Sequence, residues 1–184
     1  SLRWVFDNHR QIDSSAAVAG GRVFFGDSEG YLSALDANTG ELLWQFQPET
    51  TCGAHLWGSP VPVGDTIVLG TSSDQEVEVG PGRQCPQLDF RGSVLRVDQA
   101  TGAVLWQTFL VPPQAAGATV WSTPSVDVND NAVYATTGNN YRPPATSNSD
   151  AIIRLSLDTG EIIWSFQALA GDVFPAPGSP DFDF

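Results

Sequence analysis

The chain has 184 residues, enough for one domain with a substantial apolar core. Eight basic against 21 acidic residues leave a formal net charge of −13, which repels a phosphate backbone and argues against a nucleic-acid partner. Eighteen glycines, 13 prolines and short runs rich in valine, threonine and aromatic residues favour many short strands over long helices. No apolar run approaches the ~20 residues of a membrane-spanning helix, so no membrane span is predicted.

The first predicted element, Arg3 to Phe6, is the last strand of a preceding structural unit. After it an internal repeat dominates the chain, with copies at residues 30–44, 92–106 and 150–164. In each copy an apolar-rich run leads to a polar turn that closes in Thr-Gly, and a second run ends in Trp. Because glycine readily adopts a positive φ in such a turn, each copy is predicted to be a β-hairpin.

A second hairpin precedes each copy, so that each repeat is predicted to contain four strands. These upstream hairpins cover residues 16–26, 59–70 and 124–135. A twisted four-stranded sheet cannot bury both of its faces alone, and radial stacking of such sheets gives a propeller with shared apolar layers. We therefore predict an all-β fold, a β-propeller of four-stranded antiparallel blades. Trp44, Trp106 and Trp164 are predicted to fill the layers between blades.

The repeat also predicts the domain organisation, which is a single partial propeller domain over residues 1–184. Its blade units are predicted at 12–47, 57–109 and 121–167, with partial blades at 1–7 and 178–184. A propeller needs at least ~4 blades to close. The units are therefore expected to belong to a larger ring of roughly seven or eight blades, completed by further blades or by another copy.

Residues 72–89 and 139–149 depart from the repeat, and loops of this kind on a rigid scaffold often carry function. Cys52 and Cys85 lie in the same repeat and could form a disulfide in an oxidising compartment, although their spacing alone does not prove the bond. No Cys-x-x-Cys or Cys-x-x-Cys-His motif occurs in the sequence. This segment therefore carries neither a thiol redox motif nor a covalently attached haem.

The pattern Gly-x-hydrophobic-x-Ala-Leu-Asp-x-x-Thr-Gly-x-x-x-Trp resembles the propeller repeat named after pyrroloquinoline quinone (PQQ). That repeat occurs in quinoprotein dehydrogenases and in non-catalytic scaffolds of outer-membrane assembly, so it does not decide between catalysis and binding. The segments that decide lie between the repeats, at 70–76, 85–94, 119–127, 133–141 and 171–184. They resemble PQQ-dependent alcohol dehydrogenases of the polyvinyl-alcohol-dehydrogenase kind.

The resemblance implies a cofactor site in the third repeat. Trp121 would form the floor on which PQQ stacks, because an indole face suits a flat tricyclic quinone. Ser122, Thr123 and Arg142 are the further cofactor contacts that we expect. The structural alternative for Trp121 is another core tryptophan.

The resemblance also implies a Ca²⁺ site. Asn139, in a Gly-Asn pair, would offer its amide oxygen, and Glu76 would offer a carboxylate from the end of the segment that begins at Gly70. Because this segment contains one extra residue relative to the family pattern, Glu78 or Asp74 could replace Glu76. The structural alternatives are a turn residue with positive φ for Asn139 and an exposed loop carboxylate for Glu76.

Asp172 follows Gly171 and matches the catalytic base of the family, which also contacts the cation. A carboxylate beside Ca²⁺ can take the alcohol proton. Phe174 stands where the family usually has Trp, and the loop from Asp172 to the segment 178–184 is shortened, so the shape of the substrate site is expected to differ. The alternative for Asp172 is an ordinary turn aspartate.

Together these features predict a segment of a quinoprotein dehydrogenase that oxidises primary or secondary alcohol groups with PQQ and Ca²⁺. Electrons would pass to cytochrome c or a similar acceptor, in the periplasm or outside the cell, and the isolated segment could be inactive. The alternative is a propeller scaffold that binds proteins. The co-occurrence of Glu76, Trp121, Asn139 and Asp172 in successive blades favours the enzyme, since a scaffold does not need that set.

Overall fold

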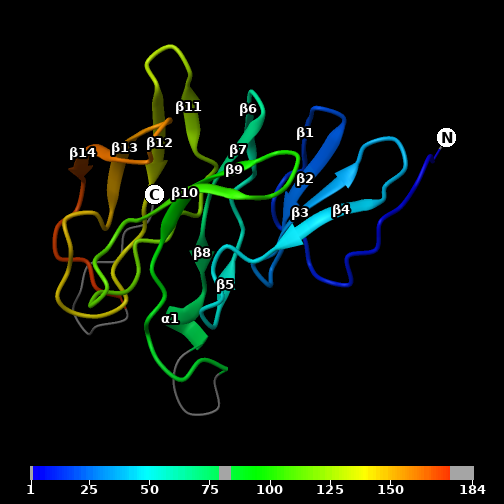
Figure 1. Ribbon diagram of the computed structural model, residues 1–184. Helices are drawn as coiled ribbons and strands as arrows, with labels where there is room; N and C mark the ends of the chain where they lie inside the picture. The colour runs from blue at the N-terminus through cyan, green and yellow to red at the C-terminus, as the bar shows by residue number, and fades with distance from the viewer. Residues whose placement is uncertain (1, 79–83, 175–184) are drawn as a thin grey trace.

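The computed structural model describes residues 2–78 and 84–174 and confirms the predicted propeller segment (Figure 1). Three four-stranded antiparallel sheets follow one another along the chain, and in each sheet the strands pair in chain order. The first sheet consists of β1 (Ala17–Ala19), β2 (Arg22–Gly26), β3 (Leu32–Asp36) and β4 (Leu42–Phe46). The second consists of β6 (Val61–Val63), β7 (Thr66–Gly70), β9 (Ser93–Asp98) and β10 (Val104–Phe109). The third consists of β11 (Ser125–Asp127), β12 (Ala132–Thr136), β13 (Ala151–Ser156) and β14 (Ile162–Gln167).

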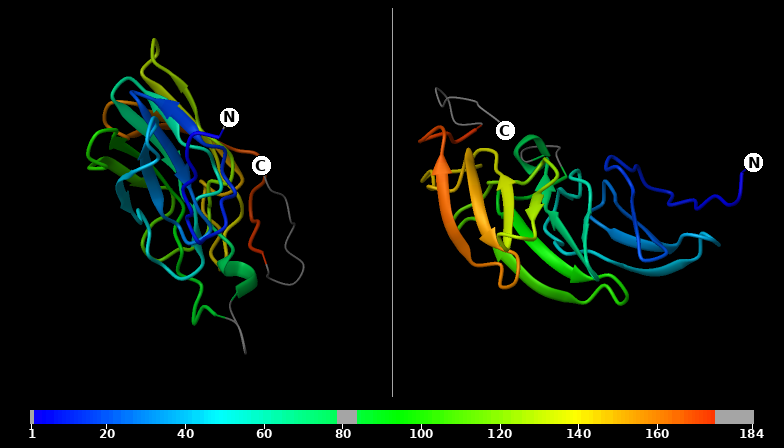
Figure 2. Two further views of the ribbon diagram at one scale, coloured as in Figure 1. Left: turned by 90° about the vertical axis from the view of Figure 1, so that its right-hand side faces the viewer. Right: turned by 90° about the horizontal axis from the view of Figure 1, so that it is seen from above.

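The sheets lie next to one another in chain order (Figure 2), and their first strands are adjacent, since β1 and β11 both contact β6. One hydrogen bond repeats along this inner edge. Ser15 N donates to Ser59 Oγ at 3.0 Å, and Ser59 N donates to Thr123 Oγ1 at 2.9 Å. All three residues stand just before the first strand of their sheet. The residue just before the first strand of each sheet therefore forms a hydrogen bond to a neighbouring blade.

The repeat tryptophans join neighbouring blades at their outer edges. Trp44 Nε1 donates to Gln99 O at 3.0 Å, and its ring lies against Gly102 of the next sheet. Trp106 makes the equivalent contact with Gly160. Both glycines have positive φ, and a β-carbon at either one would collide with the indole. The Thr-Gly turn thus serves both the hairpin and the packing, and the prediction that Trp44 and Trp106 fill the layers between blades is confirmed.

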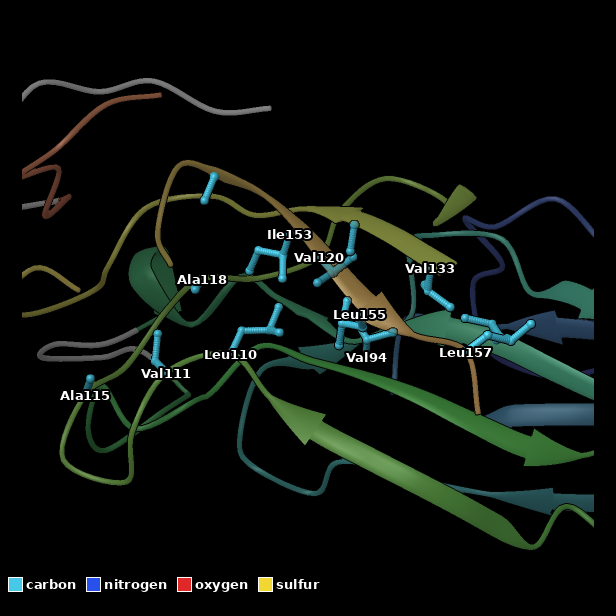
Figure 3. Close-up of a cluster of buried hydrophobic side chains, with 13 residues drawn as sticks. Val94, Leu110, Val111, Ala115, Ala118, Val120, Val133, Ile153, Leu155 and Leu157 are labelled. Atoms are coloured by element: carbon cyan, nitrogen blue, oxygen red, sulfur yellow. The ribbon is translucent and has the colours of Figure 1, made fainter. Parts of the chain in front are cut away.

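Apolar layers separate the sheets. The layer between the first and second sheets contains Phe24, Leu32, Ala34, Leu56, Ile67, Leu69, Leu95 and Val97. The layer between the second and third sheets includes Val94, Val120, Val133, Ile153 and Leu155 (Figure 3). Full burial of one such aliphatic side chain contributes roughly 1.5–3 kcal/mol relative to exposure. Each sheet therefore buries its apolar side chains against a neighbouring sheet, as the repeat predicted.

The partial blades predicted at the two ends of the chain stay predictions. Residues 2–7 form no paired strand, but the blade that would pair with them is not among the described residues. Trp4 still makes the contact of the repeat tryptophans: its Nε1 donates to Ala37 O at 3.1 Å, and its ring lies against Gly40. Trp164 is 43% exposed and contacts Tyr134 of its own sheet. The partial blade predicted at 178–184 lies outside the described residues.

The segment that departs from the second repeat forms a small structure of its own. It contains β8 (Ser72–Ser73), which pairs with β5 (Ala54–His55), and the one-turn helix α1 (Gln75–Glu78), which the sequence did not predict. A disulfide joins Cys52 to Cys85 and fastens this segment to the preceding connection. Among residues 2–78 and 84–174, no helix has the length and apolarity needed to cross a membrane.

Candidate functional site

The predicted site residues lie on connections at one end of the sheets. Glu76 lies on α1 between β7 and β9, Trp121 between β10 and β11, Asn139 between β12 and β13, and Asp172 after β14. In a sheet whose strands alternate in direction, the connection after the second strand and the connection after the fourth strand leave from the same end. The fold therefore brings together residues that are far apart in the sequence.

Backbone pairing joins three of these connections. Isolated β-bridges link Gly117 to Asn140 and Asn140 to Val173. Ala118 N donates to Asn139 O at 2.7 Å, which fixes the backbone of the predicted amide ligand. Because Asn139 and Asp172 immediately precede the bridged residues Asn140 and Val173, the predicted amide ligand and the predicted base lie on neighbouring segments.

The side chain of Asn139 is the centre of the candidate site. Its Nδ2 donates to Glu76 Oε2 at 3.3 Å, to Asn140 O at 3.0 Å and, more weakly, to Phe174 O at 3.5 Å. Asn139 is 1% exposed and Asp172 is 0% exposed. The buried amide therefore contacts the predicted carboxylate ligand and the segment that carries the predicted base.

Asp74 and Glu78 are the alternative carboxylate ligands. Asp74 Oδ2 lies 2.9 Å from His55 Nε2, and both residues line a separate polar cavity of about 460 Å³ beside the Cys52–Cys85 disulfide. The side chain of Glu78 lies outside the described part of the structure. Of the candidate acids, Glu76 is the one with a hydrogen bond to Asn139 in the described residues.

An aromatic stack surrounds the predicted cofactor floor. The rings of Trp57 and Trp121 have centroids 4.6 Å apart, and the ring of His55 stacks on Trp57 at 4.8 Å with an interplanar angle of 10°. Trp121 Nε1 is buried and has no hydrogen-bond partner among the described residues. Trp57 was not among the predicted site residues. Its signal is the likeness of residues 56–60 to 120–124, which occupy the same place in successive blades.

The other predicted cofactor contacts are Ser122, Thr123 and Arg142, and their surroundings differ from those of Trp121. Ser122 Oγ lies 2.7 Å from Thr136 Oγ1, and Thr123 Oγ1 accepts the bond from Ser59 N that links two blades. Both hydroxyl groups are exposed and already take part in the fold. Arg142 is half-buried, and its Nε has no hydrogen-bond partner in the described ranges.

Gln75 is a site residue that sequence reasoning missed. It is fully buried, and its Nε2 donates to Cys52 O at 3.1 Å and to Asp89 Oδ1 at 2.8 Å. Its Oε1 accepts hydrogen bonds from the backbone nitrogens of Asp89 and Phe90 at 2.7 and 2.8 Å. The side-chain amide of Gln75 thus fastens the α1 turn, which carries Glu76, to Cys52 on one side and to Asp89 and Phe90 on the other.

Tyr141 was also missed. It is 1% exposed, and its hydroxyl group donates to Ser73 O at 2.9 Å. Burial, reinforced by the Glu76 carboxylate, raises the pKa of Tyr141 well above its ordinary value of 10.0. The hydroxyl group therefore stays protonated over the whole physiological range. Nothing local in the sequence distinguishes Tyr141 from an ordinary core tyrosine.

The chemistry of this site fits a hard cation. Carboxylate, amide and backbone carbonyl oxygens are the ligands that Ca²⁺ takes in proteins. Glu76, Asn139 and Asp172 offer such oxygens, together with the carbonyl groups of Asn140 and Phe174 that the Asn139 amide already contacts. No group of three or more His, Cys, Asp or Glu side chains placed to hold a metal occurs in the part of the chain that the structure describes.

Successive four-stranded blades with an oxygen-rich cluster and a tryptophan pair at one end define a quinoprotein-type β-propeller segment. A protein-family model described as "Outer membrane protein assembly factor BamB" matches residues 1–149 and, in a second alignment, 90–178. The chain belongs to this family of PQQ-type propellers. That description corresponds to the scaffold alternative, whereas the individual relatives are dehydrogenases.

The polyvinylalcohol dehydrogenase of Pseudomonas sp is 28% identical over 165 residues, covering 82% of this chain and 26% of the relative. The enzyme of the same name from Sphingopyxis sp. (strain 113P3) is 29% identical over 190 residues, covering 87% of this chain and 29% of the relative. The crystal structure of quinohemoprotein alcohol dehydrogenase from Comamonas testosteroni matches with a TM-score of 0.71 and 25% identity over 88% of this chain and 28% of that chain.

These matches confirm the resemblance to PQQ-dependent alcohol dehydrogenases. The chain spans between 26% and 29% of the length of the proteins that it matches.

Proposed function

We propose that this chain is the cofactor-binding part of a PQQ-dependent dehydrogenase that oxidises alcohol groups. Glu76, Asn139 and Asp172 would hold Ca²⁺, and Trp121 would stack on PQQ. The observation that supports this most is the contact of the Asn139 amide with Glu76 Oε2 and with Phe174 O, because it joins two predicted ligands to the segment that carries the third, Asp172. The dehydrogenase names of the relatives support the same proposal.

Each residue has a role that its surroundings allow. Trp121 offers a flat apolar face, and its ring is supported by Trp57. Asp172 is excluded from solvent and would accept the hydroxyl proton of the alcohol as a general base. Asn139 and Glu76 would fix the cation beside that carboxylate. When bound, PQQ supplies the electron acceptor and Ca²⁺ supplies a Lewis acid.

The proposal includes an electron acceptor such as cytochrome c and a location in the periplasm or outside the cell. The Cys52–Cys85 disulfide suits an oxidising compartment. The net charge of −13 suits association with a basic redox protein. One relative, from Pseudomonas putida, is named a quinohemoprotein alcohol dehydrogenase, which supports a haem as the acceptor.

Titration of the purified chain with PQQ and Ca²⁺ tests cofactor binding. A ligand that binds only the folded state at 100 times its Kd stabilises that state by about 2.7 kcal/mol, which raises the unfolding midpoint. In the full-length polypeptide, Asp172→Asn is expected to keep the bound quinone absorbance and to abolish alcohol-dependent dye reduction. If neither the chain nor the full-length polypeptide responds to PQQ with Ca²⁺, the scaffold function replaces this proposal.

A further inference from the structure

The two best-defined ligand positions of the candidate site come from connections between which the described residues show no backbone pairing. Asn139 is held to the segment 172–174 by the β-bridges described above, whereas Glu76 lies on α1 of the preceding blade. In the part of the chain that the structure describes, the connection that carries Asn139 hydrogen-bonds to residues 73 and 76. Asn139 Nδ2 donates to Glu76 Oε2 on α1, and the Tyr141 hydroxyl group donates to Ser73 O on β8, just before α1.

The first of these bonds joins the side chains of two proposed ligands, so a bound cation would change it. Only the oxygen of an asparagine amide can bind a metal ion, because the lone pair of its nitrogen is delocalised into the carbonyl group. A cation shared with Glu76 would therefore contact Asn139 Oδ1 rather than the Nδ2 that donates to Glu76 Oε2. The bond between Tyr141 and Ser73 uses neither of the proposed ligand side chains and can stay in place when a cation binds.

The surroundings of Tyr141 make its hydroxyl group a defined contact. The ring packs in a buried cluster with Ala54, Phe90 and Ala116. Its acceptor belongs to Ser73, whose Oγ in turn accepts a hydrogen bond from Gln75 N at 2.9 Å at the start of α1. Ser73 precedes Glu76 by three residues, and Tyr141 follows Asn139 by two residues. The hydroxyl group thus links the backbones on which both ligands are carried.

We propose that Tyr141 is a positioning residue of the cation site: its hydroxyl group holds the α1 turn at the separation from Asn139 that a shared cation requires. This inference rests on the proposed function, because it assumes that Glu76 and Asn139 bind the same Ca²⁺. It assigns Tyr141 no contact with the cation or with a substrate.

Calorimetric titration of the purified chain with Ca²⁺ alone, without PQQ, tests the proposal. Loss of a hydrogen bond to a ligating side chain typically weakens metal binding by about 10- to 100-fold. Tyr141 acts on the backbone that leads to the ligand, so we expect Tyr141→Phe to raise the Kd for Ca²⁺ by about 10-fold, the lower end of that range. The unfolding midpoint measured in chelator should fall, because Ser73 O loses a buried hydrogen-bond donor while the ring and its packing remain, and the titrations are therefore made well below that midpoint. The matched control is Tyr134→Phe, which alters a tyrosine on β12 that packs against Trp164, away from the candidate site.

Glu76→Gln separates failure of this inference from failure of the proposed function. If the unaltered chain does not bind Ca²⁺, or if Glu76→Gln binds it normally, the proposed cation site is wrong. If Glu76→Gln loses binding but Tyr141→Phe keeps the Kd of the unaltered chain, the site stands and the role of Tyr141 is wrong.

Hydrogen exchange gives a second measurement. In the unaltered chain, Ca²⁺ should slow amide exchange at 73–78 and at 139–141 together, because both segments carry ligands of the shared cation. In Tyr141→Phe the protection at 73–78 should be weaker at the same Ca²⁺ saturation, because the hydroxyl contact with Ser73 O is lost. Equal protection in both proteins would overturn the role of Tyr141.

Discussion

The backbone of Gly117 lies directly against the backbone of Asn139, and a β-carbon at position 117 would collide with the Asn139 carbonyl oxygen and with Tyr141 N. The φ of Gly117 is +103°, a region that other residues rarely adopt. The same residue forms the β-bridge with Asn140. The absence of a side chain therefore allows the connections of two blades to approach closely enough to form the candidate site.

Gly117→Ala is accordingly expected to damage both the fold and the site. Strain in the left-handed region costs roughly 1–3 kcal/mol, and the collision displaces the Asn139 connection as well. Urea denaturation should show the loss of stability, and Ca²⁺ titration should show weaker binding. Gly64→Ala is the matched control, because Gly64 has a φ of +56° but no heavy atom within 4 Å of the added carbon. Equal losses in both variants would show that the close approach is not what requires glycine.

The docking of Trp106 onto the third sheet predicts a large effect of its removal. Replacement of a packed tryptophan by alanine typically costs about 3–5 kcal/mol, and Trp106→Ala also loses the hydrogen bond from Nε1 to Leu157 O. The loss is measured as the free energy of unfolding in denaturant. Trp164→Ala provides the comparison, since Trp164 occupies the same repeat position but is 43% exposed. A similar cost at both positions would mean that docking between blades contributes little.

The blades could be predicted from the sequence because their determinants are local. Each Thr-Gly turn and its following tryptophan lie within one hairpin, so a repeat of short patterns is sufficient to define four strands. The site depends on contacts across long separations, such as the 63 residues between Glu76 and Asn139 and the 68 between Ser73 and Tyr141. Family resemblance supplied the first pair. Composition and spacing supplied no indication of the second.

Other parts of the site were not predictable for a different physical reason. Gln75 is important because its single amide satisfies backbone groups on both adjoining segments, and a glutamine in a polar loop gives no sign of burial. Gly117 resembles any loop glycine until its neighbour across the bridge is known. The disulfide was left open because cysteine spacing does not determine pairing.

Reduction of the Cys52–Cys85 disulfide is expected to destabilise the chain. For the 33-residue separation of this bond, the loss of loop-closure entropy corresponds to about 3–4 kcal/mol. Because Gln75 Nε2 donates to Cys52 O, the Glu76 turn should loosen as well and bind Ca²⁺ more weakly. Denaturation and Ca²⁺ titration of a Cys52→Ser, Cys85→Ser variant measure both effects. Unchanged Ca²⁺ affinity in a folded variant would show that the disulfide stabilises the fold without shaping the site.

The aspartates of the Thr-Gly turns predict how stability depends on pH. Hydrogen bonds from the backbone amides of Thr39 and Asn38 lower the pKa of Asp36, and hydrogen bonds from the hydroxyl group and amide of Thr101 lower the pKa of Asp98. These bonds favour the charged form of both carboxyl groups. In the folded state the pKa of Asp36 and the pKa of Asp98 therefore lie below the ordinary value of 3.8. Their contribution is therefore present above that value and is lost as the pH falls through the lower pKa of the folded state.

The third repeat suggests the variant that tests this dependence. Its turn has Ser156 in place of the aspartate, and Ser156 Oγ accepts a hydrogen bond from Thr159 N at 3.3 Å without titrating. The variant Asp36→Ser, Asp98→Ser is therefore expected to fold and to be less stable than the unaltered chain at pH 7. Its stability should fall less steeply in acid. Thermal unfolding followed by circular dichroism at a series of pH values gives both slopes, with the exposed Asp130→Ser as control. Parallel curves for the unaltered and doubly substituted chains would show that these carboxylates do not govern acid unfolding.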